Sequence, residues 1–169
     1  MSDFTNYRNA LNFAIKGYGT LKRKNSNLPY IIHPVRIASI LRAAGYSEFQ
    51  HEELFIAALF HDLVEDTNTT LEEIEIEFGS KVALIVHEVS KPEDKSKKEW
   101  LNSFGKFSTE AKILKMADRI DNLMEMEGWS IERQKAYARQ AKIILEQCGD
   151  SNVYLSKKLE ETISFYLND

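Results

Sequence analysis

The chain has 169 residues, of which 43% are hydrophobic and 28% charged, values that are typical of one globular domain. Its formal net charge of −4 provides no excess of basic residues for a long nucleic acid or an anionic membrane. We therefore expect a single domain over residues 1–169, in which an anionic ligand would be recognised by a local cluster of Lys and Arg.

The composition also bears on the cellular compartment. The single cysteine, Cys148, excludes an internal disulfide and fits a reducing environment, and we interpret it as a packed or half-exposed helix residue. The opening MSDFTNYRNA has neither the basic nor the apolar region of a signal peptide. No apolar run approaches the roughly 18 residues of a membrane span. We expect a cytoplasmic protein.

Helical patterns follow one another along the chain, separated by a few glycines and prolines. Apolar residues recur at helical spacing between Asp3 and Tyr18. The stretch LKRKNSNLP that follows is interpreted as a polar, basic loop closed by Pro29. In HPVRIASILRAAG, Pro34 suits the first turn of a helix and Gly45 suits its C-terminal end.

Further helices are predicted in the middle of the chain. One is expected from about Glu52 to Glu65. Thr70 and Glu73 have the spacing of a capping box, and Gly79 ends the short helix that they begin.

The rest of the chain is also predicted to be helical, apart from residues 91–99, which are interpreted as a solvated loop. The other expected helices span residues 81–89, 108–127, 130–147 and 152–167. No convincing alternating strand pattern occurs. The fold class is therefore predicted to be all-α.

The stretch LFHDLVEDTNTT combines an apolar run with a group of acidic residues. In a continuous helix, at about 100° per residue, His61, Asp62, Glu65 and Asp66 share one face. The preceding LFIAALF is apolar on all sides, which indicates a helix that passes through the core.

Two interpretations of this acidic face are open. Glu65 and Asp66 could simply end a helix in water. That explanation suits His61 and Asp62 less well, because they adjoin a buried segment where an unpaired carboxylate is costly. Imidazole and carboxylate together form a mixed ligand set for a divalent metal.

Further candidate ligands occur in two other predicted helices. His33 precedes Pro34 at the expected N-cap of its helix, where it could instead be only a capping residue. In AKILKMADRIDNL, Asp118 and Asn122 are four residues apart and share a helix face, which could also be a solvated face.

The ordered set His33, His61–Asp62 and Asp118 resembles the H…HD…D pattern of the HD phosphohydrolase superfamily. The stretches PYIIHPVRIASIL, AALFHDLVEDTNTTLEEIEIEFG and KILKMADRIDNL resemble the hydrolase domain of the RelA/SpoT alarmone enzymes. In length, the chain is most similar to the small stand-alone alarmone hydrolases. The resemblance covers roughly residues 8–147 and implies a single compact HD-type helical bundle.

The resemblance implies the following site residues. The metal ligands are His33, His61, Asp62 and Asp118, with Mn²⁺ as the expected metal and Fe²⁺ as another possibility. The catalytic pair that positions or activates the attacking water is Glu65 and Asp66. The substrate-binding residues are Arg23, Lys24, Asn122, Arg133 and Tyr137. From the residues alone, the loop with Arg23 could equally carry only solvated charge.

The sequence departs from the family pattern at three places. The loop NSNLP lacks the usual glycine before the proline. Asp121 stands where relatives commonly carry His or Tyr, and Met124 replaces a frequent Arg. These departures concern nucleotide specificity more than hydrolysis.

The resemblance implies a metal-dependent enzyme that removes the 3′-pyrophosphate of guanosine tetra- or pentaphosphate, yielding GDP or GTP and pyrophosphate. Two alternatives stay open. An HD phosphohydrolase could act on another nucleotide, such as an adenosine alarmone or a nucleoside phosphate, or the protein could be a non-catalytic alarmone sensor. In each case the partner is a small nucleotide. The oligomeric state is not predicted.

Overall fold

The computed structural model describes residues 5–24 and 26–167, and it divides the chain into two compact helical units. The first unit ends at Ser90 and the second begins at Lys91. Within the described residues the regular elements are helices, and the β-type pairing there is an isolated bridge between Lys22 and Pro29. The all-α prediction is confirmed.

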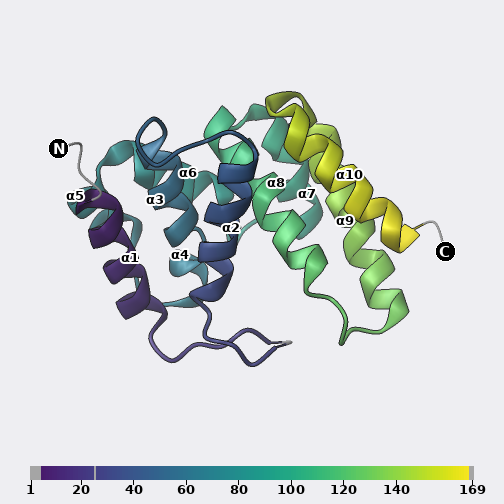
Figure 1. The fold of residues 1–169 in the computed structure, drawn as a ribbon, viewed down its shortest axis with the longest axis horizontal. Coiled ribbons are helices and arrows are strands. Elements are labelled where there is room, and N and C mark those ends of the chain that lie inside the picture. Colours follow the sequence, from purple (N-terminus) through teal and green to yellow (C-terminus); the bar gives the residue numbers. More distant parts are fainter. Residues whose placement is uncertain (1–4, 25, 168–169) are drawn as a thin grey trace. The chain divides into compact units, whose positions relative to one another are not determined.

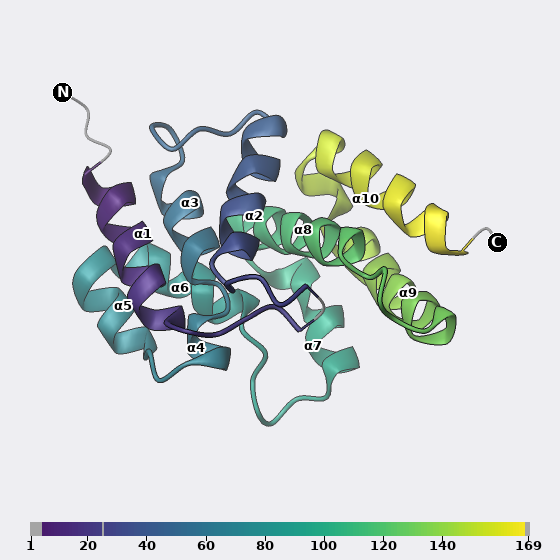
Figure 2. The same cartoon turned by 60° about the horizontal axis from the view of Figure 1, so that its bottom comes forward.

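The first unit is arranged around α3, a helix that is buried from Leu54 to Phe60. Its elements are α1 (Thr5–Tyr18), α2 (Ile32–Ala43), α3 (Glu52–Phe60), α4 (Leu63–Asp66), α5 (Leu71–Phe78) and α6 (Ser80–Val89). Both views of the ribbon show α3 between α1 and α2, and α3 also packs on α6 (Figures 1 and 2). The expected start of α1 at Asp3 lies outside the described residues.

The burial of α3 follows from its composition. Every residue from Leu54 to Phe60 is at most 3% exposed, which confirms the prediction of a helix that passes through the core. Phe60 lies in a cluster with Phe13 of α1 and Phe78 of α5, with ring centroids 4.7–5.3 Å apart. Aromatic packing at these distances holds the three helices together.

Glycine permits the close approach of α1 to α4. A Cβ atom at Gly17 would lie 2.7 Å from Cδ2 of Leu63, which is fully buried. A larger residue at position 17 would therefore have to displace Leu63 or separate the two helices.

The predicted capping box of α5 and the predicted glycines at the ends of α2 and α5 are confirmed. Thr70 and Glu73 form the reciprocal hydrogen bonds of a capping box at the start of α5. Gly79 ends α5 with φ +90° and ψ 160°, and Gly45 follows α2 with φ +93°. These backbone conformations are accessible mainly to glycine.

The second unit consists of α7 (Lys97–Ser103), a 3₁₀ turn η1 (Phe104–Lys106), α8 (Thr109–Met124), α9 (Ile131–Cys148), a 3₁₀ turn η2 (Gly149–Ser151) and α10 (Val153–Leu167). Helices α8, α9 and α10 pack against one another, and α7 packs on α9. Cys148 lies at the end of α9 and is packed rather than half-exposed, and burial raises the pKa of its thiol to about 12.

The prediction of a solvated loop over residues 91–99 is wrong for residues 97–99, which form the first turn of α7. Ser96 and Glu99 form a capping box, and the helix then buries Trp100 and Leu101. The spacing Ser-x-x-Glu before these apolar residues was the available signal.

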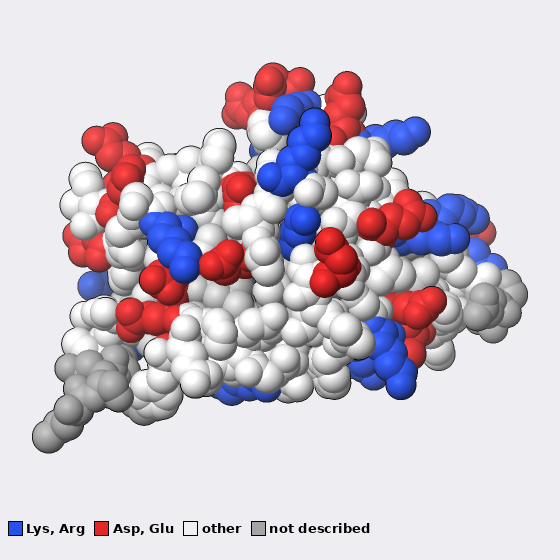
Figure 3. Space-filling model, turned by 90° about the horizontal axis from the view of Figure 1, so that it is seen from above, with Lys and Arg blue, Asp and Glu red and all other residues white. Residues whose placement is uncertain are grey.

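Two further observations concern the surface. No helix among the described residues has the length and apolar character needed to cross a membrane. On the face shown in Figure 3, Lys and Arg side chains are interspersed with Asp and Glu.

We predict that Gly79→Ala lowers the free energy of unfolding by about 1–3 kcal/mol, because an L-residue is strained at this backbone conformation. Urea denaturation measures the change. Gly128→Ala is the matched control, since Gly128 lacks a positive φ and has nothing within 4 Å of an added Cβ. Equal stability of the two variants would contradict the prediction.

Candidate metal centre

His61 lies directly after α3, at the end of the buried apolar run, and is 2% exposed. Its Nδ1 atom is 2.9 Å from the main-chain carbonyl oxygen of Ala58. A carbonyl oxygen can only accept a hydrogen bond, so we assign the proton to Nδ1. The Nε2 atom then presents its lone pair, which is the arrangement of a metal-binding histidine.

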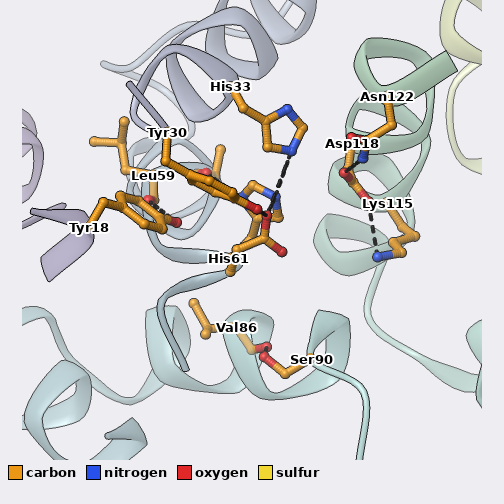
Figure 4. Close-up of polar contacts among 12 residues, drawn as sticks. Tyr18, Tyr30, His33, Leu59, His61, Val86, Ser90, Lys115, Asp118 and Asn122 are labelled. Carbon is orange, nitrogen blue, oxygen red and sulfur yellow. Dashed lines mark hydrogen bonds and ion pairs between the residues drawn. The ribbon is translucent and has the colours of Figure 1, made fainter. Parts of the chain in front are cut away.

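His33 is fully buried in the first turn of α2. The prediction that it caps this helix is wrong, because Ile31 occupies the N-cap position and α2 begins at Ile32. From this position in the first turn, the imidazole of His33 points toward His61 (Figure 4). The two Nε2 atoms lie 3.2 Å apart.

Asp62 interrupts the helix that was expected to continue to Glu65. Its φ of −107° and ψ of −2° separate α3 from the short α4, so the prediction of one continuous helix is wrong. Such values belong to a sparsely populated backbone region in which many active-site residues occur.

The interruption places the Asp62 carboxylate beside both imidazoles. Its Oδ2 atom is 2.9 Å from Nε2 of His61 and 3.7 Å from Nε2 of His33. Two ring nitrogens and a carboxylate oxygen thus converge within 4 Å of one another. A divalent cation among them would satisfy all three, and this donor set suits Mn²⁺, Fe²⁺ or a related metal.

Tyr30 is a site residue that sequence reasoning missed. Its hydroxyl donates a hydrogen bond of 2.6 Å to Oδ2 of Asp62. Burial, and next the negative charge of Asp62, raise the pKa of the Tyr30 hydroxyl, so it remains a donor at neutral pH. Tyr30 precedes His33 by three residues in PYIIHP, but no periodicity or spacing rule marks it.

Glu65 and Asp66 lie in α4, about one turn after His61, and both are exposed. Asp66 lines an open groove of about 600 Å³ together with Lys16 of α1 and Thr69. The two carboxylates are therefore accessible to solvent, whereas His33 and His61 are buried.

In the second unit, Asp118 is held from both of its oxygen atoms. Lys115 lies 3.0 Å from Oδ2, and the side-chain amide of Asn122 donates to Oδ1 (Figure 4). Asp118 is only 5% exposed, so the interpretation of its helix face as solvated is wrong. Sequence reasoning missed Lys115, which is 6% exposed and lies 4.5 Å from the Trp100 ring centroid.

Arg133 and Tyr137, both on α9, belong to one cluster of rings and cations within the second unit. The Arg133 guanidinium lies 3.7 Å from the ring centroid of Trp129, and Trp129 makes a T-shaped contact with Tyr137. Arg119 and Lys97 lie 4.4 and 5.4 Å from the centroid of Tyr137. Cations at these distances are attracted by the ring faces.

Arg23 and Lys24 lie in the loop between α1 and α2, as expected. Lys24 is exposed, whereas Arg23 is partly buried with its guanidinium 5.4 Å from the ring centroid of Tyr30. The stretch NSNLP, which lacks the usual glycine, contains one residue with a positive φ among those that the structure describes. Asn27 adopts φ +56°, a left-handed conformation that asparagine tolerates better than most residues.

The two other departures from the family pattern, both on α8, differ in their exposure. Asp121 is 5% exposed, whereas Met124 is 63% exposed. Only Asp121 therefore changes the polarity of a buried position.

We predict that Lys115→Met lowers the free energy of unfolding by about 3 kcal/mol, because it leaves the buried Asp118 carboxylate without its cation. Urea denaturation of metal-free protein measures this change. Lys158→Met, which breaks the exposed pair with Glu161, is the control and should cost at most about 1 kcal/mol. A Lys115→Met variant as stable as this control would show that the Asp118 pair is not required.

Comparison with known proteins identifies the family to which the chain belongs. A sequence model of the HD domain matches residues 10–146, a span that includes parts of both units. The chain is 35% identical over 161 residues to the guanosine-3′,5′-bis(diphosphate) 3′-pyrophosphohydrolase MESH1 of Danio rerio, covering 89% of this chain and 88% of that protein. It is 34% identical to MESH1 of Homo sapiens, with 89% of each chain covered.

The fold agrees with this match. A solved structure of a metazoan ortholog of SpoT that hydrolyzes ppGpp has a TM-score of 0.86 and 30% identity, with 95% of each chain covered. The predicted HD-type class is confirmed. With its matched sequence model, its relatives and its fold, the chain belongs to the HD-domain family.

Proposed function

We propose that the protein is a metal-dependent pyrophosphohydrolase that removes the 3′-pyrophosphate of ppGpp or pppGpp and releases GDP or GTP. The observation that carries this proposal is the convergence of the side chains of His33, His61 and Asp62. The exposed Glu65 and Asp66 follow Asp62 in the chain by three and four residues. The names of the MESH1 relatives supply the substrate class. On this proposal, the reaction consumes the alarmones of the stringent response in the cytoplasm.

The proposed metal ligands are His33, His61 and Asp62, with Asp118 as the fourth ligand from the family pattern. Neutral imidazole and carboxylate oxygen favour Mn²⁺, with Fe²⁺ as a second choice. A metal bound there would lower the pKa of a water molecule and stabilise negative charge on the phosphoryl oxygens.

Glu65 is proposed as the general base. Its exposed carboxylate, about one turn after His61, can accept a proton from the attacking water. The water oxygen then forms a bond to the phosphorus attached to the ribose O3′, the P–O3′ bond breaks, and O3′ takes a proton. Asp66, beside Glu65 in α4, is proposed to orient the same water.

The substrate carries several negative charges, so its recognition requires cations. We propose that Arg23 and Lys24 contact the phosphates from the loop after α1. Asn122 and the pair Arg133 and Tyr137 are proposed to contact the nucleotide from α8 and α9. Arginine beside an aromatic ring suits both a phosphate and a purine face.

The proposed activity predicts that metal-stripped protein releases pyrophosphate from ppGpp only after Mn²⁺ is added. Release is measured beside GDP, GTP and a pppApp-type nucleotide as controls. Turnover of a control nucleotide instead of ppGpp would overturn the substrate while keeping the hydrolase. Binding of ppGpp without any turnover would identify a sensor.

A further prediction distinguishes the role of the general base from that of the metal ligands. Glu65→Gln should lower kcat by about 10²- to 10⁴-fold, the usual contribution of a general base, while Mn²⁺ binding persists. Asp62→Ala should abolish Mn²⁺ binding. Glu75→Gln, an exposed acid on α5, is the control and should keep full activity. Normal turnover by Glu65→Gln would exclude Glu65 as the base.

A further inference from the structure

Tyr30 is fixed through its main chain at the junction of the loop and α2. Its N–H donates to the carbonyl oxygen of Leu21 at 2.9 Å, beside the bridge between Lys22 and Pro29. Its carbonyl oxygen accepts from the N–H of His33 at 3.0 Å. The backbone of Tyr30 is thus connected directly to that of a proposed metal ligand.

The ring of Tyr30 is held as firmly as its backbone. It stacks on Tyr18, with centroids 4.9 Å apart and an interplanar angle of 28°. Tyr18 is itself 2% exposed and donates from its hydroxyl to the carbonyl oxygen of Leu59. The edge-on contact with His33, at 6.0 Å and 88°, restricts the ring on another side.

This packing directs one donor at one acceptor. The Tyr30 hydroxyl reaches Oδ2 of Asp62, the same oxygen that lies 2.9 Å from His61 Nε2 and within 4 Å of His33 Nε2. An ionised carboxylate oxygen has more than one lone pair, so Oδ2 can accept from Tyr30 and still face a cation.

We propose that Tyr30 is a positioning residue of the metal centre, whose hydroxyl fixes the Asp62 carboxylate in the orientation that faces the two imidazoles. The proposal rests on the proposed function only in taking Asp62 as a ligand. Without the hydroxyl, the 22%-exposed Asp62 side chain can rotate toward solvent, and a metal must first restrict it. Groups that orient ligands in this way typically contribute about 10- to 100-fold to metal affinity.

The contact with Arg23 sharpens the expectation. Arg23 lies over the Tyr30 ring, and Tyr30→Phe keeps that ring while removing only the hydroxyl. The substitution should therefore raise the Kd for Mn²⁺ and leave KM for the nucleotide unchanged. Excess Mn²⁺ should restore kcat, because the defect lies in metal occupancy.

The experiment is a titration of metal-stripped protein with Mn²⁺, followed by electron paramagnetic resonance of the free ion, in the absence of nucleotide. Tyr30→Phe is compared with Tyr18→Phe, which removes the hydroxyl of the stacked ring but leaves Asp62 untouched. We expect a Kd about 10- to 100-fold higher for Tyr30→Phe and an unchanged Kd for Tyr18→Phe.

Two results would overturn this proposal alone: a wild-type Kd in Tyr30→Phe, or an equal weakening in both variants, which would indicate general destabilisation. Because no nucleotide is present, either result can occur while the wild-type protein still hydrolyses ppGpp. Failure of the wild-type protein to bind Mn²⁺ would overturn the metal centre and this proposal together.

Discussion

The close approach of two imidazoles and a carboxylate is the constraint on which the rest of the first unit depends. His33, His61 and Asp62 bring two ring nitrogens and a carboxylate oxygen within 4 Å of one another, an arrangement that a shared cation or proton stabilises. The surrounding architecture enforces it. The apolar α3 places His61 at the end of a rigid core segment, and the first turn of α2 brings His33 alongside. The unusual backbone of Asp62 then turns its carboxylate inward.

The proposed site combines rigid and accessible parts. The residues that would hold a metal lie at the ends of buried elements, whereas Glu65, Asp66 and Lys24 are exposed. This division suits hydrolysis of a large anion, since ligand geometry must be preorganised while the substrate and water must enter. On α8, the buried Lys115 and the side-chain amide of Asn122 likewise fix the carboxylate of Asp118.

The sequence predicted those parts of the structure that depend on local rules. The capping box of Thr70 and Glu73 and the positive φ of Gly79 follow from short-range chemistry. The break at Asp62 could not be predicted, because apolar residues on both sides continue the helical period and only tertiary packing reveals the turn. Tyr30 was missed for a related reason, since its partner lies 32 residues away. In contrast, α7 was missed although Ser96 and Glu99 carried a readable signal.

The contact between Gly17 and Leu63 has a consequence for reading natural variation in this family. Gly17 touches none of the proposed ligands, yet a single added methyl group would press on Leu63, the residue that follows Asp62. Loss of activity can therefore arise from a substitution that a list of ligands would class as harmless. A homologue with a larger residue at position 17 should carry a smaller side chain than leucine at position 63. Such paired substitutions would show that the spacing between α1 and α4 has been maintained during evolution.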